Sequence, residues 1–260
     1  MIIELDKDNR MSLHKLFDSY PYMRGCVAAA IEDGAGKVFA DSQQNPSVAL
    51  AVIDFQFLAG DPFHSSVPQL FSLLHYGEWL IVPTPDWQHV VSTTYSGKIE
   101  VYQREAFQAE QFDVDKLNRF ISELPTDFEL RRVRLEDAAQ FAELSPSLIS
   151  SYASPKEFIK QGVGIGIFHE GKFVSGASSS PIGGRKLEFE IQTHKQFRRR
   201  GFARIVAAAL ILYCIENGLE PCWDAANEPS SALARQLGFC SIGKYNAFWL
   251  PQPKDKISAS

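Results

Sequence analysis

The sequence has few cysteines, few basic residues and no long apolar run, and each shortage excludes a class of protein. Its four cysteines are far apart and form no Cys-x-x-Cys pair, which argues against a disulfide framework and against a zinc site. No stretch approaches the roughly 20 apolar residues that a membrane-spanning helix needs, and the acidic start shows no signal peptide. We therefore expect a cytoplasmic protein with reduced thiols, no metal and no membrane partner.

Positive charge is scarce overall, with 26 basic against 31 acidic residues and a net charge of -5. It is also unevenly distributed, because residues 1–125 carry a net charge of -8 and residues 126–260 a net charge of +3. A nucleic-acid-binding protein would need a much stronger basic stripe, so we exclude that partner. The basic second half suits an anionic small ligand better.

A break at residues 124–127 divides the chain into two halves. In the first half the patterns predict helices at 12–22, 67–75 and 113–124, strands at 25–31, 37–40, 47–57, 78–82 and 98–107, and a loop at 83–87. In the second they predict strands at 128–134, 162–168, 173–180 and 186–194, helices at 136–144, near Glu157 and at 202–215, and a final strand, helix and strand. We expect an α+β protein with an N-terminal α+β domain (1–125), a second domain (126–250) and a C-terminal tail (251–260).

The most informative stretch is the predicted strand 186–194 together with the apolar helix that follows it. The strand alternates, so that Glu188 and Glu190 lie on one face. A basic turn, Arg198 to Gly201, separates it from the helix. The first N–H groups of a helix have no intrahelical partner and the dipole there is positive, so three arginines at this end predict a phosphate site. A solvated basic turn is the alternative reading of the arginines alone.

Two motifs in this order resemble the GNAT superfamily of N-acetyltransferases. Thr193-His-Lys-Gln-Phe-Arg-Arg-Arg-Gly-Phe-Ala203 resembles its pyrophosphate loop, Arg/Gln-x-x-Gly-x-Gly/Ala. Residues 227–239 resemble its Asn-x-x-Ala-x-x-Leu-x-x-x-x-Gly-Phe segment, with Ser230 and Leu233 at the small and apolar positions. More narrowly, Glu190-Ile-Gln-Thr193 and Cys222-Trp-Asp-Ala-Ala-Asn227 resemble the zwittermicin A resistance type of this superfamily.

The resemblance implies a central, mostly antiparallel sheet flanked by helices over residues 126–250, with acetyl-CoA as cosubstrate. It places the cofactor on a set of residues in the two motifs. These are Gln192, Thr193, Arg198, Arg199, Arg200, Gly201, Phe202, Ala203, Arg204, Asn227 and Ser230. For three of them another role stays open: Arg199 and Arg200 could meet the 3′-phosphate or solvent, and Asn227 could be a helix N-cap.

The same resemblance implies that an amine attacks the acetyl-CoA thioester directly, without an acyl-enzyme. We favour Glu190 over Glu188 as the general base; the alternative for either is a structural ion pair with a neighbouring Arg or a side chain that faces solvent. Many family members carry a Tyr acid where this chain has Ala234, so Tyr245 or water is expected to protonate the leaving thiolate.

We expect an N-acetyltransferase that acts on a primary amine of a small molecule, such as an aminopolyol antibiotic or another aminated metabolite. Trp223 is expected as core or pocket wall and Asp224 as a grip for a cationic substrate. The alternative is a non-catalytic acyl-CoA-binding regulatory module; a dinucleotide-binding dehydrogenase is excluded because Gly-x-Gly-x-x-Gly is absent. The first half could be a degenerate, non-catalytic copy of the GNAT unit, and the protein a monomer or homodimer.

Overall fold

The structure, a computed structural model, describes residues 1–18 and 20–252, which form two compact units. Unit 1 comprises Met1–Arg104 and the chain from Lys244 onward, and unit 2 comprises Glu105–Gly243. The units therefore divide at residues 104–105 and 243–244 rather than at the expected boundary of 125–126, which lies inside unit 2. Most of the expected tail, residues 253–260, is outside the described residues.

Unit 1 is built on a mixed sheet. Its strands are β1 (Ile3–Glu4), β2 (Lys37–Ala40), β3 (Val48–Val52), β4 (Gln56–Gly60), β5 (Glu78–Ile81) and the last part of β12 (Phe239–Leu250), in that order across the sheet. Its helices are η1 (Lys7–Leu13), α1 (His14–Phe17), α2 (Arg24–Ile31), α3 (Val67–Phe71) and α4 (Pro85–Thr94). Neighbouring strands are antiparallel, except that β4 and β5 are parallel.

Three elements of unit 1 differ from the sequence predictions. The single strand predicted at 47–57 is two antiparallel strands, β3 and β4, joined by residues 53–55. The other two misreadings have a local cause. Residues 25–31, predicted as a strand, belong to helix α2; every one of them is buried, and an apolar run buried on all sides has no period that separates helix from strand. The predicted loop at 83–87 contains the start of α4. Thr84 Oγ1 caps that helix by accepting a hydrogen bond from the Trp87 backbone N–H (3.3 Å), and Pro85 occupies its first turn.

Unit 2 contains a second mixed sheet. Its strands are β7 (Glu129–Arg132), β8 (Gly164–His169), β9 (Lys172–Gly183), β10 (Lys186–Thr193), β11 (Glu220–Ala225) and the last part of β6 (Glu100–Ala109), in that order. Its helices are α5 (Val114–Ser122), η2 (Leu135–Asp137), α6 (Ala138–Leu144), η3 (Pro146–Leu148), α7 (Pro155–Gln161), η4 (Lys195–Phe197), α8 (Phe202–Asn217) and α9 (Glu228–Leu237). Only β10 and β11 are parallel neighbours.

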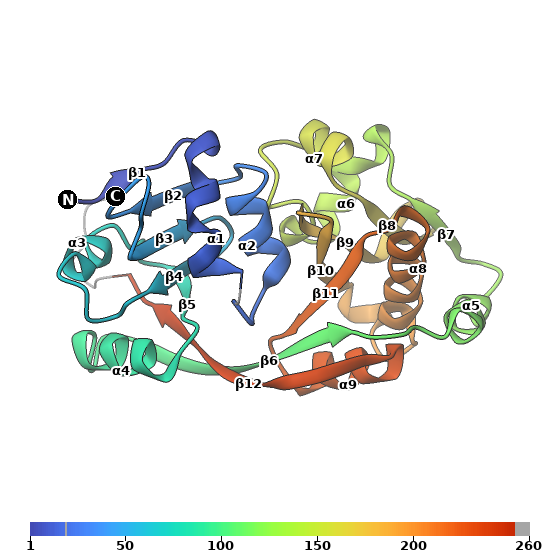
Figure 1. Ribbon diagram of the computed structural model, residues 1–260. Coiled ribbons are helices and arrows are strands. Elements are labelled where there is room, and N and C mark those ends of the chain that lie inside the picture. Colours follow the sequence, from blue (N-terminus) through green and yellow to red (C-terminus); the bar gives the residue numbers. More distant parts are fainter. Residues whose placement is uncertain (19, 253–260) are drawn as a thin grey trace, which may run out of the picture. The chain divides into compact units, whose positions relative to one another are not determined.

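Helix α8 forms the centre of unit 2. It lies against β8, β9 and β10, with α5 on its outer side (Figure 1). Side chains such as Val206 and Leu210 are fully buried against Ile167 and Leu187 of the sheet. Burial of one large apolar side chain stabilises the folded state by about 1.5–3 kcal/mol. The helix is therefore a rigid support for the residues at its N-terminus.

The two units repeat one order of elements. Each contains a strand, a helical segment, three antiparallel strands, a helix, a parallel strand, a second helix and a last strand. The last strands are exchanged, because β6 follows α4 of unit 1 but pairs with β11, whereas β12 follows α9 of unit 2 but pairs with β5. The expected mixed α/β fold, with a mostly antiparallel sheet flanked by helices, is confirmed. No helix in the described part of the chain is long and apolar enough to span a membrane.

Candidate functional site

The candidate site begins where β10 separates from β11. Strand β10 pairs with β9 along its whole length, but its register with β11 covers only Lys186–Glu188 opposite Glu220–Cys222. The rest of β11 pairs with β6 on its other side. From Phe189 to Thr193, the β11-facing edge of β10 thus has no strand partner among the described residues, and its backbone groups can pair with an extended ligand.

The basic turn at the end of β10 has a constrained backbone. Arg199 and Gly201 have positive φ angles of 67° and 82°, and Arg198 Nε donates a hydrogen bond to the Thr193 carbonyl oxygen at 3.0 Å. Arg200 lies over the Phe197 ring, 5.4 Å from its centroid. All three arginines are exposed. The turn therefore directs three cations to solvent at the point where α8 begins.

Helix α8 lacks a side-chain cap at this end. Its N-cap is Gly201, and its first turn contains no acidic residue. Side chains cap α4, α5, α7 and α9, whereas α1, α2, α3 and α6 lack a side-chain cap as α8 does. A Cβ atom built on Gly201 would meet only Arg204 Nη2, at 3.7 Å, so the space in front of the amides is open. The positive end of a helix with nearby arginines is an arrangement that can attract an anion.

Arg204 is engaged elsewhere. Its guanidinium forms an ion pair with Glu123, just beyond α5, and lies 4.4 Å from the centroid of the Phe120 ring. Most of its charge therefore stabilises the contact between α5 and α8. The exposed Arg198, Arg199 and Arg200 are the cations that remain for an anionic ligand.

The two glutamates of β10 have different surroundings. Glu188 is buried, with only 4% of its surface exposed, whereas Glu190 is partly exposed. Two donors converge on the same oxygen of Glu190: Ser147 Oγ at 2.7 Å and Gln192 Nε2 at 2.8 Å from Oε1. The expected cofactor residue Gln192 thus contacts the expected base. The other cofactor residue of this strand, Thr193, forms a hydrogen bond with Ser175 Oγ at 2.8 Å.

The start of α9 is organised by hydrogen bonds within the protein. Asn227 Oδ1 accepts from the Ser230 backbone N–H (3.1 Å), which is an N-cap, and Trp223 Nε1 donates to Ser230 Oγ (3.2 Å). Trp223 is 5% exposed and packs between Phe189 and Phe239. Trp223 is therefore a core residue that also positions α9. Its neighbour Asp224 is half-buried.

Tyr245 belongs to unit 1. Its ring stacks on Tyr22 with centroids 3.8 Å apart, and it is 3% exposed. Ala234, which stands where many relatives of the expected family have a tyrosine, is fully buried in unit 2.

Sequence reasoning missed a group of hydroxyl side chains beside Glu190. Residues 145–154 include five serines, and several of them bridge to the sheet. Ser151 Oγ lies 2.8 Å from Ser180 Oγ, and Tyr152 Oη lies 2.6 Å from Ser179 Oγ. The density of serine in this segment was the available signal, but nothing in its spacing indicated which strand it contacts.

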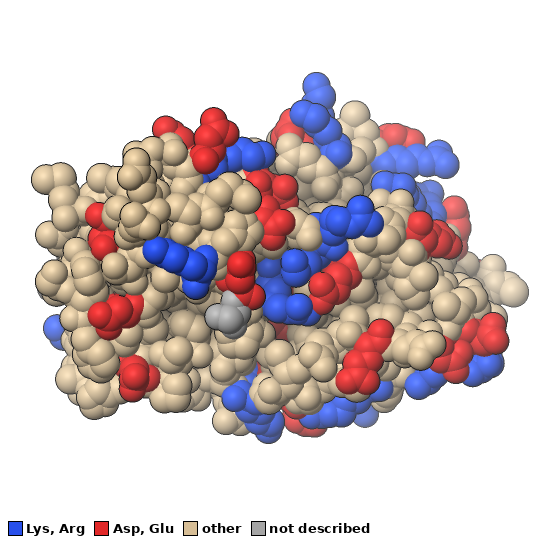
Figure 2. Space-filling model, in the orientation of Figure 1, with Lys and Arg blue, Asp and Glu red and all other residues tan. Residues whose placement is uncertain are grey.

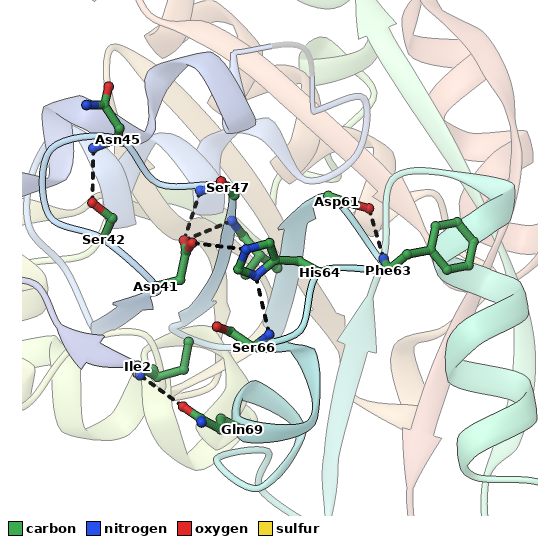
Figure 3. Close-up of polar contacts among 11 residues, drawn as sticks. Ile2, Asp41, Ser42, Asn45, Ser47, Asp61, Phe63, His64, Ser66 and Gln69 are labelled. Atoms are coloured by element: carbon green, nitrogen blue, oxygen red, sulfur yellow. Dashed lines mark hydrogen bonds and ion pairs between the residues drawn. The ribbon is translucent and has the colours of Figure 1, made fainter.

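The equivalent place in unit 1, between β4 and α3, has the opposite chemistry (Figure 3). Residues 60–71 contain no Lys or Arg, and α3 has only 5 residues where α8 has 16. Side chains of this loop accept hydrogen bonds from the loop's own backbone N–H groups. Phe63 N–H donates to Asp61 Oδ1 (2.9 Å) and Ser66 N–H to His64 Nδ1 (3.3 Å) (Figure 3).

Asp41 adds negative charge beside this loop. Its Oδ2 lies 3.7 Å from His64 Nε2. Burial alone would raise the pKa of Asp41, but hydrogen bonds from the backbone N–H groups of Ser47 and Val48 leave it lowered, so the carboxylate is ionised. An anion would be repelled here.

On the face drawn in Figure 2, acidic and basic side chains are interspersed among large uncharged areas. Within residues 1–18 and 20–252, no group of three or more His, Cys, Asp or Glu side chains could hold a metal ion.

Comparison with known proteins gives consistent results over nearly the whole chain. Residues 14–248 match the family model described as GNAT acetyltransferase. An uncharacterized N-acetyltransferase of Bacillus subtilis (strain 168), YdfB, is 26% identical over 259 residues, covering 95% of this chain and 97% of the relative.

Solved structures show the same fold. The crystal structure of a GCN5-related N-acetyltransferase-like protein from Streptococcus suis 89/1591 matches with a TM-score of 0.82 and 28% identity, covering 93% of this chain and 98% of that one. A tandem GNAT protein from the clavulanic acid biosynthesis pathway matches with a TM-score of 0.57 and 12% identity, covering 95% and 97% of the two chains.

Proposed function

The chain belongs to the GNAT acetyltransferase family, a family of acyltransferases, and from this premise we propose that it transfers the acetyl group of acetyl-CoA to a primary amine of a small molecule. The amine attacks the thioester carbonyl directly. The C–N bond forms, the C–S bond breaks, and the ammonium proton passes to a base while the CoA thiolate leaves. The observation that carries the proposal is the uncapped, arginine-flanked start of α8.

The pyrophosphate of acetyl-CoA binds at that helix start in our proposal. The backbone N–H groups of residues 200–203 would donate hydrogen bonds to its oxygens, and Arg198, Arg199 and Arg200 would neutralise its charge. Gly201 supports this assignment because its φ of 82° and the open space above it allow a phosphate to approach the backbone closely. The 3′-phosphate could take one of the three arginines.

The acyl-bearing arm of the cofactor would lie along β10. This arm is extended and contains amide groups, and the edge of β10 from Phe189 to Thr193 has backbone groups without a strand partner among the described residues. Pairing of the arm with this edge would place the thioester next to the middle of the strand. Glu190 is in that part of β10.

We assign the general base to Glu190. It is partly exposed, so that water or an amine can reach it, whereas Glu188 is 4% exposed. For the acid, the burial of Tyr245 against Tyr22 favours the other expectation, that water protonates the thiolate. Asp224, half-buried on β11, is retained as the group that attracts a cationic acceptor.

Unit 1 does not bind acetyl-CoA in this proposal, although it is a degenerate copy of the GNAT unit. Its repeated order of elements and the fold likeness to a tandem GNAT protein support the common origin. The loop before α3 is acidic, and its own side chains accept hydrogen bonds from its backbone N–H groups. Both features support the loss of the cofactor site.

The acceptor would be cationic and polar, such as an aminopolyol or another aminated metabolite. The net negative charge of the first 125 residues would attract a cation, and the serine-rich segment beside Glu190 offers hydroxyl groups that match a hydroxylated compound. None of the four cysteines, all of which lie in the described residues, forms a disulfide, which supports a cytoplasmic location.

A panel of primary amines with acetyl-CoA tests the proposal through CoA release. We expect turnover with at least one aminated, hydroxylated compound, and a Glu190→Gln variant that loses about 10²–10³ of kcat with its acetyl-CoA affinity unchanged. Glu216→Gln, an exposed position at the far end of α8, is the control. Acetyl-CoA binding without turnover on any amine would contradict the enzymatic proposal, and full activity of Glu190→Gln would contradict the choice of base.

A further inference from the structure

The geometry points to Ser147 as a positioning residue for Glu190, a role that rests on the proposed function of Glu190 as the base. Ser147 is in η3, 43 positions away from Glu190 in the sequence. Its hydroxyl donates to Glu190 Oε1 at 2.7 Å. It thereby fixes a side chain that would otherwise rotate at the partly exposed middle of β10.

Ser147 is itself oriented by its neighbours. Its Oγ lies 2.8 Å from Ser145 Oγ, and if the Ser147 proton is directed to Glu190, Ser145 supplies the hydrogen atom in that contact. Ser150 Oγ donates to the Ser147 backbone oxygen at 3.2 Å, which holds the turn of η3. The backbone of η3 is anchored by Leu148, which is fully buried against Phe141.

Both donors to Glu190 contact one oxygen. Ser147 Oγ and Gln192 Nε2 bind Oε1, and no described residue forms a hydrogen bond with Oε2. A carboxylate held at one oxygen presents the lone pairs of the other in a fixed direction. Oε2 is therefore the atom that would take the proton, and Ser147 together with Gln192 determines where it points.

A purely structural role for Ser147, as a tether between η3 and β10, predicts a different result. Removal of a tether would lower stability but leave the Glu190 carboxylate in its place. Removal of a positioning donor misplaces Oε2. The position of the Glu190 side chain and the effect on kcat therefore distinguish the two roles.

The test compares Ser147→Ala, Ser147→Thr and Ser122→Ala in the full chain. Ser122 is the matched control, because its Oγ donates to the Arg119 carbonyl oxygen at 2.8 Å within α5. Crystal structures of the variants without ligand locate the Glu190 side chain directly. We expect its carboxylate to leave the wild-type position in Ser147→Ala, and to keep that position in Ser147→Thr, which retains a hydroxyl, and in Ser122→Ala.

Activity provides the second measurement, with the amine that gives the fastest CoA release in the panel. Ser147→Ala should lose about 5- to 20-fold in kcat with little change in the KM for acetyl-CoA. An unmoved Glu190 carboxylate or an unchanged kcat in Ser147→Ala would overturn the inference. If no amine is turned over, the proposed function fails, and the ligand-free structures still decide whether Ser147 fixes the position of Glu190.

Discussion

At the scale of single residues, the sequence indicated which side chains could take part in chemistry but not what they contact. The alternation of β10 predicts that Glu188 and Glu190 lie on one face, and their catalytic role stays a proposal. Their difference in burial depends on segments far away in the chain, because Ser147 approaches Glu190 from η3. A pattern of period two describes one strand and contains no information about what covers it. The hydroxyl cluster was missed for this reason.

Glu105 allows a pH prediction at the same scale. The Ser241 hydroxyl, 2.6 Å from Oε1, is the largest cause of a lowered pKa of Glu105; burial opposes it, and Arg235 at 2.5 Å adds to the lowering. Because the folded-state pKa is below the unfolded value, this stabilisation is present above the unfolded pKa, close to 4.5, and is lost as pH falls through the folded value.

We therefore expect Glu105→Gln to flatten the pH dependence of unfolding in the acid range. Urea denaturation of wild type and variant at pH 7 and at about pH 3 measures this. The two proteins should differ in stability at pH 7 and approach each other at low pH. A difference in stability that is the same at both pH values would contradict the assignment. Glu216→Gln, at an exposed site, serves as the control.

At the scale of elements, α8 and β10 were predicted well because their patterns are long and their ends carry clear signals. Helix α8 ends at Asn217 and is capped by Gly218, which has the left-handed conformation that the Asn217-Gly218 pair predicts. Helix α2 was mistaken for a strand because all residues from 25 to 31 are buried. Helix α4 was missed because Pro83 and Pro85 were read as loop residues, although Thr84 followed by Pro85 is also a cap followed by a first helical turn.

The N-cap of α9 gives a prediction for the element scale. Asn227→Ala removes the acceptor of the Ser230 N–H and should destabilise the protein by about 1 kcal/mol. If capping is its role, acetyl-CoA affinity should change by less than about twofold, and thermal denaturation and calorimetric binding measure both quantities. Thr84→Ala, which removes the cap of α4 in unit 1, is the matched control. A tenfold loss of affinity in Asn227→Ala alone would instead identify Asn227 as a cofactor contact.

At the scale of the whole molecule, the boundary between units was the least predictable feature. The break at residues 124–127 is a real turn, but α5 before it packs on α8 and β6 completes the sheet beside β11. The exchange of the last strands leaves no local sequence pattern, because the residues of β6 and β12 do not indicate which sheet each strand joins. The repeated order of elements was visible in the sequence, and the exchanged last strands were not.

A fragment of residues 126–250 should therefore fail to fold. It lacks β6, so the outer edge of β11 would be unpaired, and it lacks α5, so Phe120 and the buried Leu117 would no longer cover α8. Near-ultraviolet circular dichroism and gel filtration of the fragment should show loss of tertiary packing and association. A monomeric fragment with a cooperative unfolding transition would refute the importance of the exchanged strand.

Calorimetric titration of the full chain with acetyl-CoA tests the central claim most directly. The account predicts one molecule bound per chain, because among the described helices α8 is the one whose start is flanked by three exposed arginines. It also predicts that Gly201→Glu abolishes binding, whereas Gly171→Glu, at a turn in the same unit with a similar φ of 81° and nothing within 4 Å of an added Cβ, retains it. Two molecules bound per chain, or unchanged affinity in Gly201→Glu, would contradict the account.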